Sequence, residues 1–501
     1  TTDFTANNIL TYKKTFAEVH NLRVLAGQEY YEYNTEYIYG SRSGFPTLGL
    51  EQPVGASTLN DFTGNADQYK LLSFFGNAEY NYNHKYYGSA SLRSDGSSRF
   101  AKDSRWGTFW SVGGSWRISE EDFMQDLSLI NSLTLRASYG GQGNDNVGYY
   151  AYQGLFSIKN NLGESGFVTS SLENKNLKWE TNLNFNVGLD YVLFRGRLSG
   201  SVEFFTRRSK DLLFDLPKAL STGYGSYTTN AGGLKNTGVE FSITGTPIQT
   251  KDWKWTLSVN GTHYKNELTE LPQSQIITGN YIRRVGGSVH DFFLVEWAGV
   301  NPETGLPQWY KTNDNGERVI TGVYSEADNP QSKIVAGTAL PDLLGGFSTN
   351  LQFKDFELSA LFAYSLGGKI YNADKLMIMA NGSTAGRAMS TDLLNRWTPE
   401  NPNTDIPRMQ TTNASAWTEP STRFLIDADY LRLKNIFLGY NVPRNILQKA
   451  NLNALKVYVQ AENLWTLFGE QGIDPEQTVS GATYYRYPAM KTISLGLNLS
   501  F

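Results

Sequence analysis

The sequence predicts an all-β fold, and more narrowly a transmembrane antiparallel β-barrel. Three observations predict this fold: hydrophobic residues recur with a period of two, short turns alternate with long polar loops, and aromatic residues reach 14% of the chain. The mean hydropathy is −0.40, and no apolar run approaches the roughly 18 residues that a membrane-spanning helix needs. A helical membrane protein is therefore excluded, whereas spanning strands remain possible.

The composition is uniform along the 501 residues. A chain of this length usually forms several soluble domains, but no proline-rich or serine-rich linker divides it. Its 48 glycines, 30 tyrosines, 27 phenylalanines and 11 tryptophans are spread over the whole length. We therefore expect one architecture to include all of residues 1–501. The composition alone fits a soluble, aromatic-rich all-β protein equally well.

The period of two is clearest where one face of a segment is apolar and the other polar. One example has Phe185, Val187, Leu189, Tyr191 and Leu193 alternating with Asn184, Asn186, Gly188 and Asp190. The end of the chain repeats the pattern, with Ile493, Leu495, Leu497, Leu499 and Phe501 alternating with Thr492, Ser494, Gly496, Asn498 and Ser500. Such segments predict half-buried strands.

About fifteen strands are predicted in this way. They lie near residues 7–19, 22–39, 69–82, 86–93, 105–118, 132–140, 179–194, 197–213, 234–248, 253–265, 343–353, 356–370, 424–442, 454–465 and 488–501.

The connections between these strands alternate in length. Short turns occur at 20–21, 83–85, 195–196, 250–252 and 354–355, and long polar stretches occur at 40–68, 141–178, 214–233, 266–342, 371–423 and 466–487. A soluble sandwich or propeller gives no reason for every second connection to be long. Outer-membrane barrels have short periplasmic turns and longer external loops, so the pattern favours the membrane barrel.

The strand count also predicts that strands precede Thr1. Bacterial single-chain barrels usually have an even number of strands, with their ends on the periplasmic side. An odd number must then lie upstream, and about seven more would complete a barrel of about 22 strands. A lumen of that width needs a plug.

Several segments resemble the SusC/RagA group of TonB-dependent outer-membrane transporters, from about residue 70 to the end. The strongest are the stretch at 396–407 (RWTPENPNTDIP) and the strand at 430–440 (YLRLKNIFLGY). Weaker ones are 135–140 with Gly143 and Asn144, 176–181, 188–190, 197–202 with 210–213, and 236–240. Their order and spacing together make the resemblance specific.

The resemblance implies a 22-stranded barrel in the bacterial outer membrane, with a plug inside it and a SusD-like lid lipoprotein over its mouth. It implies active import of a nutrient, either an oligosaccharide or a peptide, with energy supplied by TonB, ExbB and ExbD. Residues 1–501 are then expected to form the C-terminal part of a single outer-membrane β-barrel, and the plug and the TonB box are expected upstream of Thr1. A passive, porin-like channel is the alternative, and a plug and a TonB box would discriminate the two.

The sequence predicts no catalytic residue, no metal site and no cofactor. It has no cysteine, and its four histidines, His20, His84, His263 and His290, lack metal-ligand spacing. Asp427 and Asp429 resemble a glycosidase pair, but residues two apart on a strand more simply line a wet lumen. A net charge of −4 argues against nucleic-acid binding. We therefore expect a protein that is not an enzyme.

Aromatic residues in the long loops are the candidate substrate contacts. They could stack on sugar rings or hold a peptide, and they could equally pack the loops together. These candidates are Trp309, Tyr310, Trp397, Trp417, Tyr484 and Tyr485. Phe501 ends the last apolar strand and resembles the C-terminal signal by which outer-membrane barrels engage their assembly machinery, although a closing strand needs the same pattern.

Overall fold

The computed structural model describes residues 1–49, 52–380, 386–410, 416, 418–448 and 452–501. Fifteen of its strands form one sheet in the order β1-β2-β3-β4-β5-β6-β9-β10-β13-β14-β22-β23-β26-β27-β28. They are β1 (Thr2–Phe16), β2 (His20–Ser43), β3 (Thr58–Tyr82), β4 (Tyr86–Ser97), β5 (Trp106–Arg117), β6 (Ile130–Asn144), β9 (Glu180–Leu193), β10 (Leu198–Lys210), β13 (Gly233–Gln249), β14 (Trp253–Glu270), β22 (Leu343–Phe353), β23 (Phe356–Leu366), β26 (Tyr430–Asn441), β27 (Ala454–Phe468) and β28 (Thr492–Ser500). The predicted number of strands in this large sheet and their antiparallel order are confirmed, whereas the short strands inside the long loops were not predicted.

Several predicted boundaries differ from the structure. The segment 356–370, expected to be one strand, divides into β23, which ends at Leu366, and a short strand that begins at Lys369. The stretch at 40–68, expected to be a loop, is mostly strand, because β2 continues to Ser43 and β3 begins at Thr58. The segment 424–442, expected to be one strand, divides into β25 (Leu425–Asp427) and β26. β25 leaves the large sheet to pair with β24 (Lys369–Tyr371). Polar strands that extend beyond a hydrophobic band have no apolar face, so the period of two underestimates their length.

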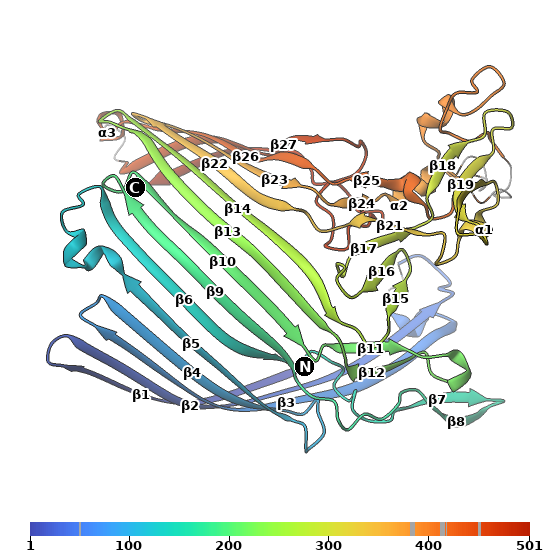
Figure 1. Ribbon diagram of the computed structural model, residues 1–501, viewed down its shortest axis with the longest axis horizontal. Helices are drawn as coiled ribbons and strands as arrows, with labels where there is room; N and C mark the ends of the chain where they lie inside the picture. The colour runs from blue at the N-terminus through green and yellow to red at the C-terminus, as the bar shows by residue number, and fades with distance from the viewer. Residues whose placement is uncertain (50–51, 381–385, 411–415, 417, 449–451) are drawn as a thin grey trace. The chain divides into compact units, whose positions relative to one another are not determined.

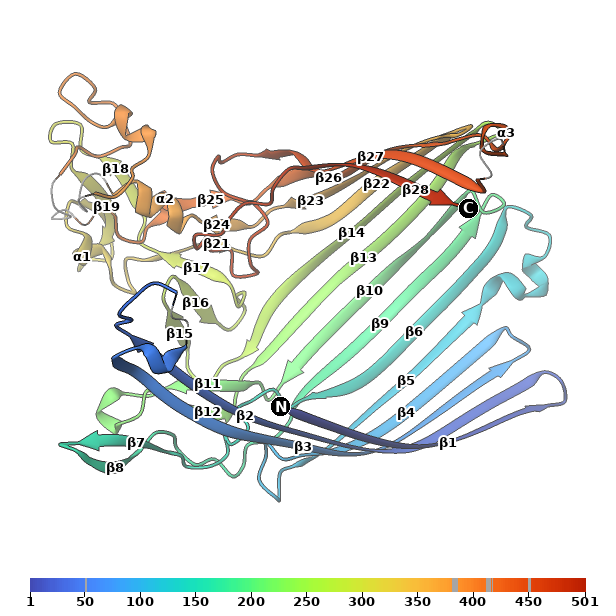
Figure 2. The same ribbon diagram turned by 180° about the vertical axis from the view of Figure 1, so that it is seen from behind.

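The first compact unit comprises residues 1–126, 133–188 and 206–234. Its strands β1–β5 lie side by side in sequence order (Figures 1 and 2). Tight turns join β1 to β2 and β3 to β4, with positive φ at Ala17, Glu18, Asn83 and His84. Two small hairpins belong to its longer loops: β7 (Phe156–Asn161) with β8 (Glu164–Thr169), and β11 (Leu213–Pro217) with β12 (Ser226–Asn230).

The second compact unit comprises residues 127–132, 189–205 and 235–501. Its strands β14, β22, β23, β26, β27 and β28 pair in that order. Its long loops form small sheets and short helices at one end of these strands (Figure 1). They contain β15 (Gln275–Thr278), β16 (Tyr281–Arg284), β17 (Asp291–Leu294), β18 (Trp297–Val300), β19 (Pro307–Thr312), β20 (Arg318–Thr321), α1 (Tyr324–Ala327), β21 (Ile334–Thr338) and α2 (Ala373–Ile378). The helix α3 (Arg444–Leu447) follows β26 at the opposite end.

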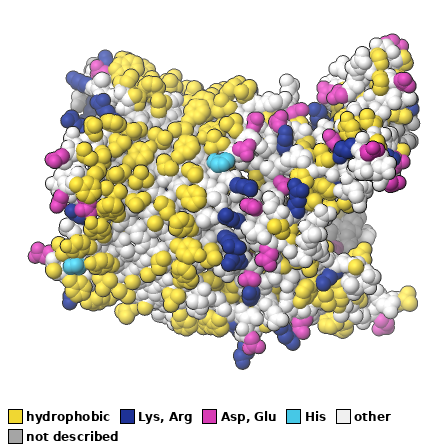
Figure 3. Space-filling view, in the orientation of Figure 1, with side chains coloured by type: hydrophobic (Ala, Val, Ile, Leu, Met, Phe, Trp, Pro, Cys, Tyr) yellow, Lys and Arg dark blue, Asp and Glu magenta, His cyan; other side chains and the backbone are white. Residues whose placement is uncertain are grey.

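Each unit's sheet has one apolar face and one polar face. On β28, Leu495 and Leu497 are 79% and 69% exposed and stand opposite Val459 and Val457 of β27. Between them, Gly496 faces the other way, where it lies under the ring of Tyr458. Exposed apolar side chains in such numbers do not suit water. In Figure 3 they gather over the strands, whereas charged side chains are denser toward the loops. No helix among the described residues is long and apolar enough to cross a membrane.

Aromatic residues form rows at the short-turn end of each unit's strands. In the first unit, Tyr82, Tyr86 and Trp116 follow one another with ring centroids 6.3 and 6.5 Å apart. In the second, the ring of Trp253 lies 4.1 Å from that of Phe353, and the ring of Phe356 lies 4.6 Å from that of Tyr440. Such rows are typical of the boundary between hydrocarbon and water, where amphipathic rings are most stable.

Candidate functional site

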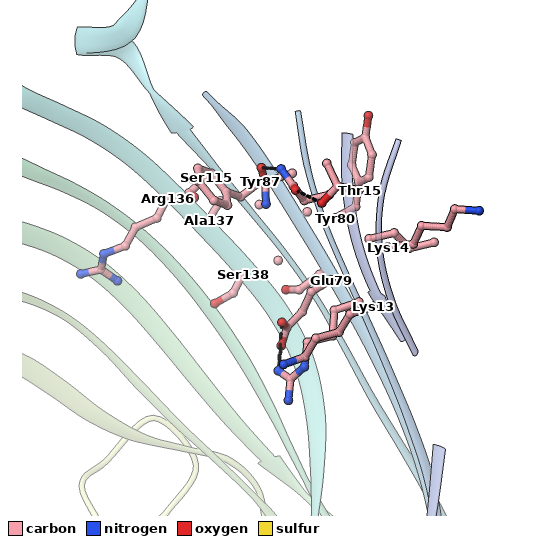
Figure 4. A pocket seen from close by; sticks show the side chains of 18 of the residues that line it. Lys13, Lys14, Thr15, Glu79, Tyr80, Tyr87, Ser115, Arg136, Ala137 and Ser138 are labelled. Carbon is pink, nitrogen blue, oxygen red and sulfur yellow. Dashed lines mark hydrogen bonds and ion pairs between the residues drawn. The ribbon is translucent and has the colours of Figure 1, made fainter. Parts of the chain in front are cut away.

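The polar face of the first unit contains a cavity of about 810 Å³. Strands β1–β6 and β9 line it near their short-turn end. The register aligns Lys13 with Arg23, Arg23 with Glu79, and Glu79 with Ser89 across four neighbouring strands. These residues share one face because side chains on a strand alternate. Figure 4 shows Lys13, Glu79 and Ser138 around the cavity, with Lys14 and Tyr80 pointing away.

Ion pairs and close backbone approaches shape this cavity. Arg23 Nη1 contacts Glu79 Oε2 at 3.2 Å, and both side chains are more than two-fifths exposed, so the pair adds little stability. The guanidinium of Arg136 lies over Gly188, where a Cβ would meet its carbon at 2.7 Å. This face of the sheet therefore carries both cationic and anionic side chains. Such a surface is suited to contact with water or with polar segments of a protein.

The external loops of the second unit have a hydrophobic core of their own. Phe292, Leu294 and Val295 of the β17 region pack with Trp309, Tyr371, Met379, Leu393 and Phe424. These residues come from segments more than 100 residues apart in the sequence. Burial of this many large side chains holds a loop assembly in one arrangement. These loops therefore form one packed substructure, and they are not independent connections between strands.

The loop at 469–491 is fixed to the sheet by a buried ion pair. Arg432 of β26 is 4% exposed and Asp474 is 7% exposed, and Arg432 Nη2 donates to Asp474 Oδ1 at 2.6 Å. Arg432 Nη1 also donates to Glu476 Oε2 at 2.8 Å, and Lys434 Nζ donates to the same carboxylate at 2.9 Å. Asp474 in turn accepts from the backbone amides of Glu476 and Ala489, at 3.0 and 2.8 Å. One arginine and one aspartate therefore fold the loop back on the strand.

The middle of the same loop is bound to β24 and α2. The amide of Thr483 donates to the carbonyl of Tyr371 at 3.1 Å, and the amide of Tyr485 donates to Asp374 Oδ1 at 2.8 Å. Tyr281 adds a hydrogen bond from its hydroxyl to the carbonyl of Ser480 at 2.8 Å. A cavity of about 450 Å³ lies between this loop and strands β14, β22, β23 and β26.

The attachment at Asp474 predicts a pH dependence. Burial acts to raise the pKa of the Asp474 carboxyl, but hydrogen bonds from Arg432 and the two backbone amides outweigh it and hold the pKa below its ordinary value. A carboxyl with a lowered folded-state pKa stabilises the fold above its unfolded pKa of about 3.9 and loses that contribution as the pH falls through the folded value. Hydrogen exchange at the Glu476 amide, corrected for intrinsic rates, should stay slow at pH 5 and accelerate only below about pH 4. Acceleration already between pH 7 and 5 would contradict this assignment.

Three of the predicted contact residues help to pack the loop assembly. Trp309 is 1% exposed and its ring packs edge-on against Trp297 and Tyr324. Trp397 lies against Gly305, and its Nε1 donates to the carbonyl of Pro302 at 2.9 Å. The ring of Tyr310 is half-buried beneath Arg318. In this arrangement, the ring of Trp309 has no surface on which a ligand could stack.

The remaining candidates lie elsewhere. Tyr484 and Tyr485 are 84% and 67% exposed, with ring centroids 5.8 Å apart, on the loop that Asp474 fixes. Trp417 lies outside the described residues. Phe501 follows β28 and is 88% exposed. The roles of these residues in ligand contact and assembly stay predictions.

Several aspartates and histidines, which are residue types that can bind metals or act in catalysis, make structural contacts in this protein. Asp427 pairs with Lys369, and Asp429 accepts from the amide of Gly367. His20 Nδ1 hydrogen-bonds Tyr80, and His263 Nδ1 hydrogen-bonds the carbonyl of Asp342. Burial, with a smaller effect from Arg283, lowers the pKa of His290. Among the described residues, no group of three or more histidines and carboxylates could hold a metal ion.

Sequence reasoning missed the Arg432–Asp474 pair and the cavity of the first unit. An arginine near the start of β26, between two leucines, was a signal, since a buried charge needs a partner. The partner could not be found from the sequence, because 42 residues separate Arg432 from Asp474.

Comparisons with known proteins agree with this architecture. Residues 1–464 match the family described as TonB dependent receptor-like, beta-barrel. TonB-dependent receptor P3 of Formosa agariphila is 31% identical over all of this chain and 52% of its own length. TonB-dependent receptor SusC of Bacteroides thetaiotaomicron is 32% identical over 93% of this chain and 48% of its own. The structure of the RagAB peptide transporter matches all of this chain and 55% of its own at 32% identity and a TM-score of 0.88.

The chain belongs to the TonB-dependent receptor β-barrel family of the outer membrane. Within that family it is of the SusC/RagA type, as the motifs at 396–407 and 430–440 indicated. The family consists of transporters, which agrees with the prediction that the protein is not an enzyme. The chain spans about half the length of the relatives it matches.

Proposed function

We propose that this chain is the barrel portion of an importer that takes up a nutrient, an oligosaccharide or a peptide, through the outer membrane. Import would draw energy from TonB, ExbB and ExbD through a plug and a TonB box outside this chain. The observation that carries the proposal is the match over the whole chain to a RagAB peptide transporter at a TM-score of 0.88. The word peptide describes the cargo of that protein. For this protein, the proposed cargo is either an oligosaccharide or a peptide.

A SusD-like lid lipoprotein is the proposed partner at the outer surface. The matched transporter is a RagAB complex, and it has also been described in closed-closed and open-open states at TM-scores of 0.88 and 0.87. The loop assembly of the second unit, with its own core, supports the proposal because loops this long and this well packed are usually functional. A bare pore needs no such surface.

Uptake in cells distinguishes active import from passive diffusion. In a strain that expresses the complete transporter, deletion of tonB should abolish uptake, because a plug that fills the lumen must be moved by work done from the periplasmic side. Deletion of the lid gene alone should lower uptake at low cargo concentration. The tonB deletion strain carrying a plasmid copy of tonB serves as the control. Undiminished uptake without TonB would contradict the proposal and favour a porin-like channel.

A further inference from the structure

The loop at 469–491 lies over the polar face of the second unit's sheet. Arg432 of β26 stands opposite Ala363 of β23, Ala363 opposite Gly346 of β22, and Gly346 opposite Asn260 of β14. Side chains at one register position share a face, so Arg432 lies on the face of Asn260. Leu257, which is apolar and 39% exposed, lies on the other face. The polar face of an outer-membrane barrel lines its lumen. The loop that Arg432 binds therefore covers part of the lumen wall.

Charged groups hold this loop to β26. Asp474 and Glu476 both bind Arg432, and Glu476 also binds Lys434. Beside these contacts, a cavity of about 450 Å³ separates the loop from the strands. Its lining includes Val479 of the loop and Leu344 of β22. Apolar side chains that line a cavity make no packing contact across it, so the charged groups supply much of this attachment.

The middle of the same loop is packed closely against the loop assembly. The amide of Tyr371 donates to the carbonyl of Gly481 at 2.7 Å, and the amide of Thr483 donates to the carbonyl of Tyr371 at 3.1 Å. The amide of Asp374 donates to Thr483 Oγ1 at 3.1 Å, and Thr483 is 1% exposed. A Cβ on Gly481 would lie 2.6 Å from the Cβ of Ala339. This attachment therefore consists of backbone hydrogen bonds and close packing.

The two attachments differ in what separation would cost. When the loop leaves β26, Arg432 and Asp474 both regain water, and the desolvation of a buried ion pair offsets much of its Coulomb attraction. When the loop leaves the loop assembly, backbone groups at Tyr371, which is 4% exposed, lose hydrogen bonds in a buried position. Val479 lies between the two attachments and is 64% exposed, so the chain has room to bend there. We therefore expect the loop to separate first from β26.

We propose that the loop at 469–491 is a gate that separates from β26 while it remains bound to the loop assembly. The closed gate covers Arg432 and the cavity beneath the loop, and the open gate exposes both to the lumen. Residues 480–485 are joined to β24 and α2, so a displacement of the loop assembly also moves the gate. The external loops are thereby coupled to the lumen wall. The motion is defined by contacts within this chain and does not depend on the class of cargo.

Hydrogen exchange at single amides of the complete transporter in lipid nanodiscs tests the gate. The amides of Glu476 and Ala489, which donate to Asp474, report separation from β26. The amides of Tyr371 and Thr483 report separation from the loop assembly. After correction for intrinsic rates, the first pair should exchange about tenfold faster than the second, or more.

A reversible cross-link tests whether this faster exchange requires the gate to open. Residues 1–501 contain no cysteine, so Lys434→Cys combined with Glu476→Cys places two thiols where a partly exposed ion pair stood. A bis-methanethiosulfonate reagent joins the thiols, and a reductant removes the link. Cross-linking should slow exchange at Ala489 by about tenfold or more, reduction should restore it, and exchange at Thr483 should not change. Each single cysteine variant treated with the reagent is a control.

Tyr281→Phe is the matched control at the other attachment. It removes the hydroxyl that donates to the carbonyl of Ser480. Exchange at Ala489 should stay unchanged in this variant, because the gate opens at β26. Thermal unfolding of every variant separates a change in the gate from loss of the fold.

Three results would overturn the gate. Equal exchange at the two pairs of amides would show that the loop opens as a whole. Faster exchange at Tyr371 and Thr483 would show that the loop leaves the loop assembly and stays on the sheet. Unchanged exchange at Ala489 after complete cross-linking would show that exchange there does not require separation from β26. Any of these results together with uptake that depends on TonB removes this inference alone. The expected exchange together with uptake independent of TonB removes the proposed function alone.

Discussion

Leu495→Arg should destabilise the complete barrel by about 2–4 kcal/mol. Leu495 is 79% exposed on the apolar face of β28, and this face contacts lipid because the chain belongs to an outer-membrane barrel family. A guanidinium near the bilayer midplane loses its hydration. Leu497 is a weaker site for the test. It pairs with Val457, which pairs with Tyr440 of the aromatic row, and the cost of a charge falls near the interface.

The matched control is Ser494→Arg, one residue away on the other face of β28. Ser494 stands opposite Gln460, so its cross-strand neighbour on β27 is uncharged. Asn498 is less suitable because it stands opposite Lys456, which pairs with Glu357 at 2.5 Å. Ser494→Arg should cost no more than about 0.5 kcal/mol, as for other solvated positions. Urea unfolding in lipid vesicles measures both variants. Equal losses would show that the assignment of the two faces is wrong.

Arg432→Ala should release the loop at 469–491 and leave the sheet folded. Removing one partner of a buried ion pair costs about 3–5 kcal/mol, because the other charge remains buried without compensation. Arg432 and Asp474 are both under 10% exposed. This energetic cost therefore applies while the loop at 469–491 is folded against the sheet. The amide of Ala489, which donates to Asp474 Oδ2, should then exchange with solvent about two orders of magnitude faster or more.

Lys434→Ala is the control for this loop. Lys434 pairs with Glu476 at 2.9 Å, but both side chains are about one-third exposed, and such pairs contribute about 1 kcal/mol or less. Exchange at Ala489 should therefore change little. Asp474→Ala combined with Arg432→Ala should cost less than the sum of the single changes, because the two residues form one interaction. Unchanged exchange in the Arg432→Ala variant would mean that the contacts with Tyr371 and Asp374 hold the loop by themselves.

The strands could be predicted because their signal is local. A strand in a membrane barrel has lipid on one side and water or polar chain on the other, so each one carries its own period of two. The segments 132–140, 253–265 and 343–353 lie within β6, β14 and β22. The signal disappears where a strand leaves the hydrophobic band. For this reason β3 begins well before its predicted boundary, and β2 extends a few residues past its own.

The loop residues could not be assigned in the same way. The sequence does not distinguish a buried aromatic residue in a long loop from an exposed one. In the structure, Trp309 is 1% exposed and Tyr484 is 84% exposed. The difference comes from packing between distant segments, such as Val295 with Phe424 in the loop core. No periodic pattern encodes such contacts, because each depends on how several loops fold over one another.

The sequence by itself determined the all-β class, the number of strands in the large sheet, which residues share a face, and the SusC/RagA resemblance. Each of these follows from neighbouring residues or from short motifs in a fixed order. Only the tertiary structure decided that Arg432 holds Asp474 and that Trp309 packs a loop core. Burial and ion pairing are set by chain segments that meet in space, and those meetings are decided by the fold as a whole.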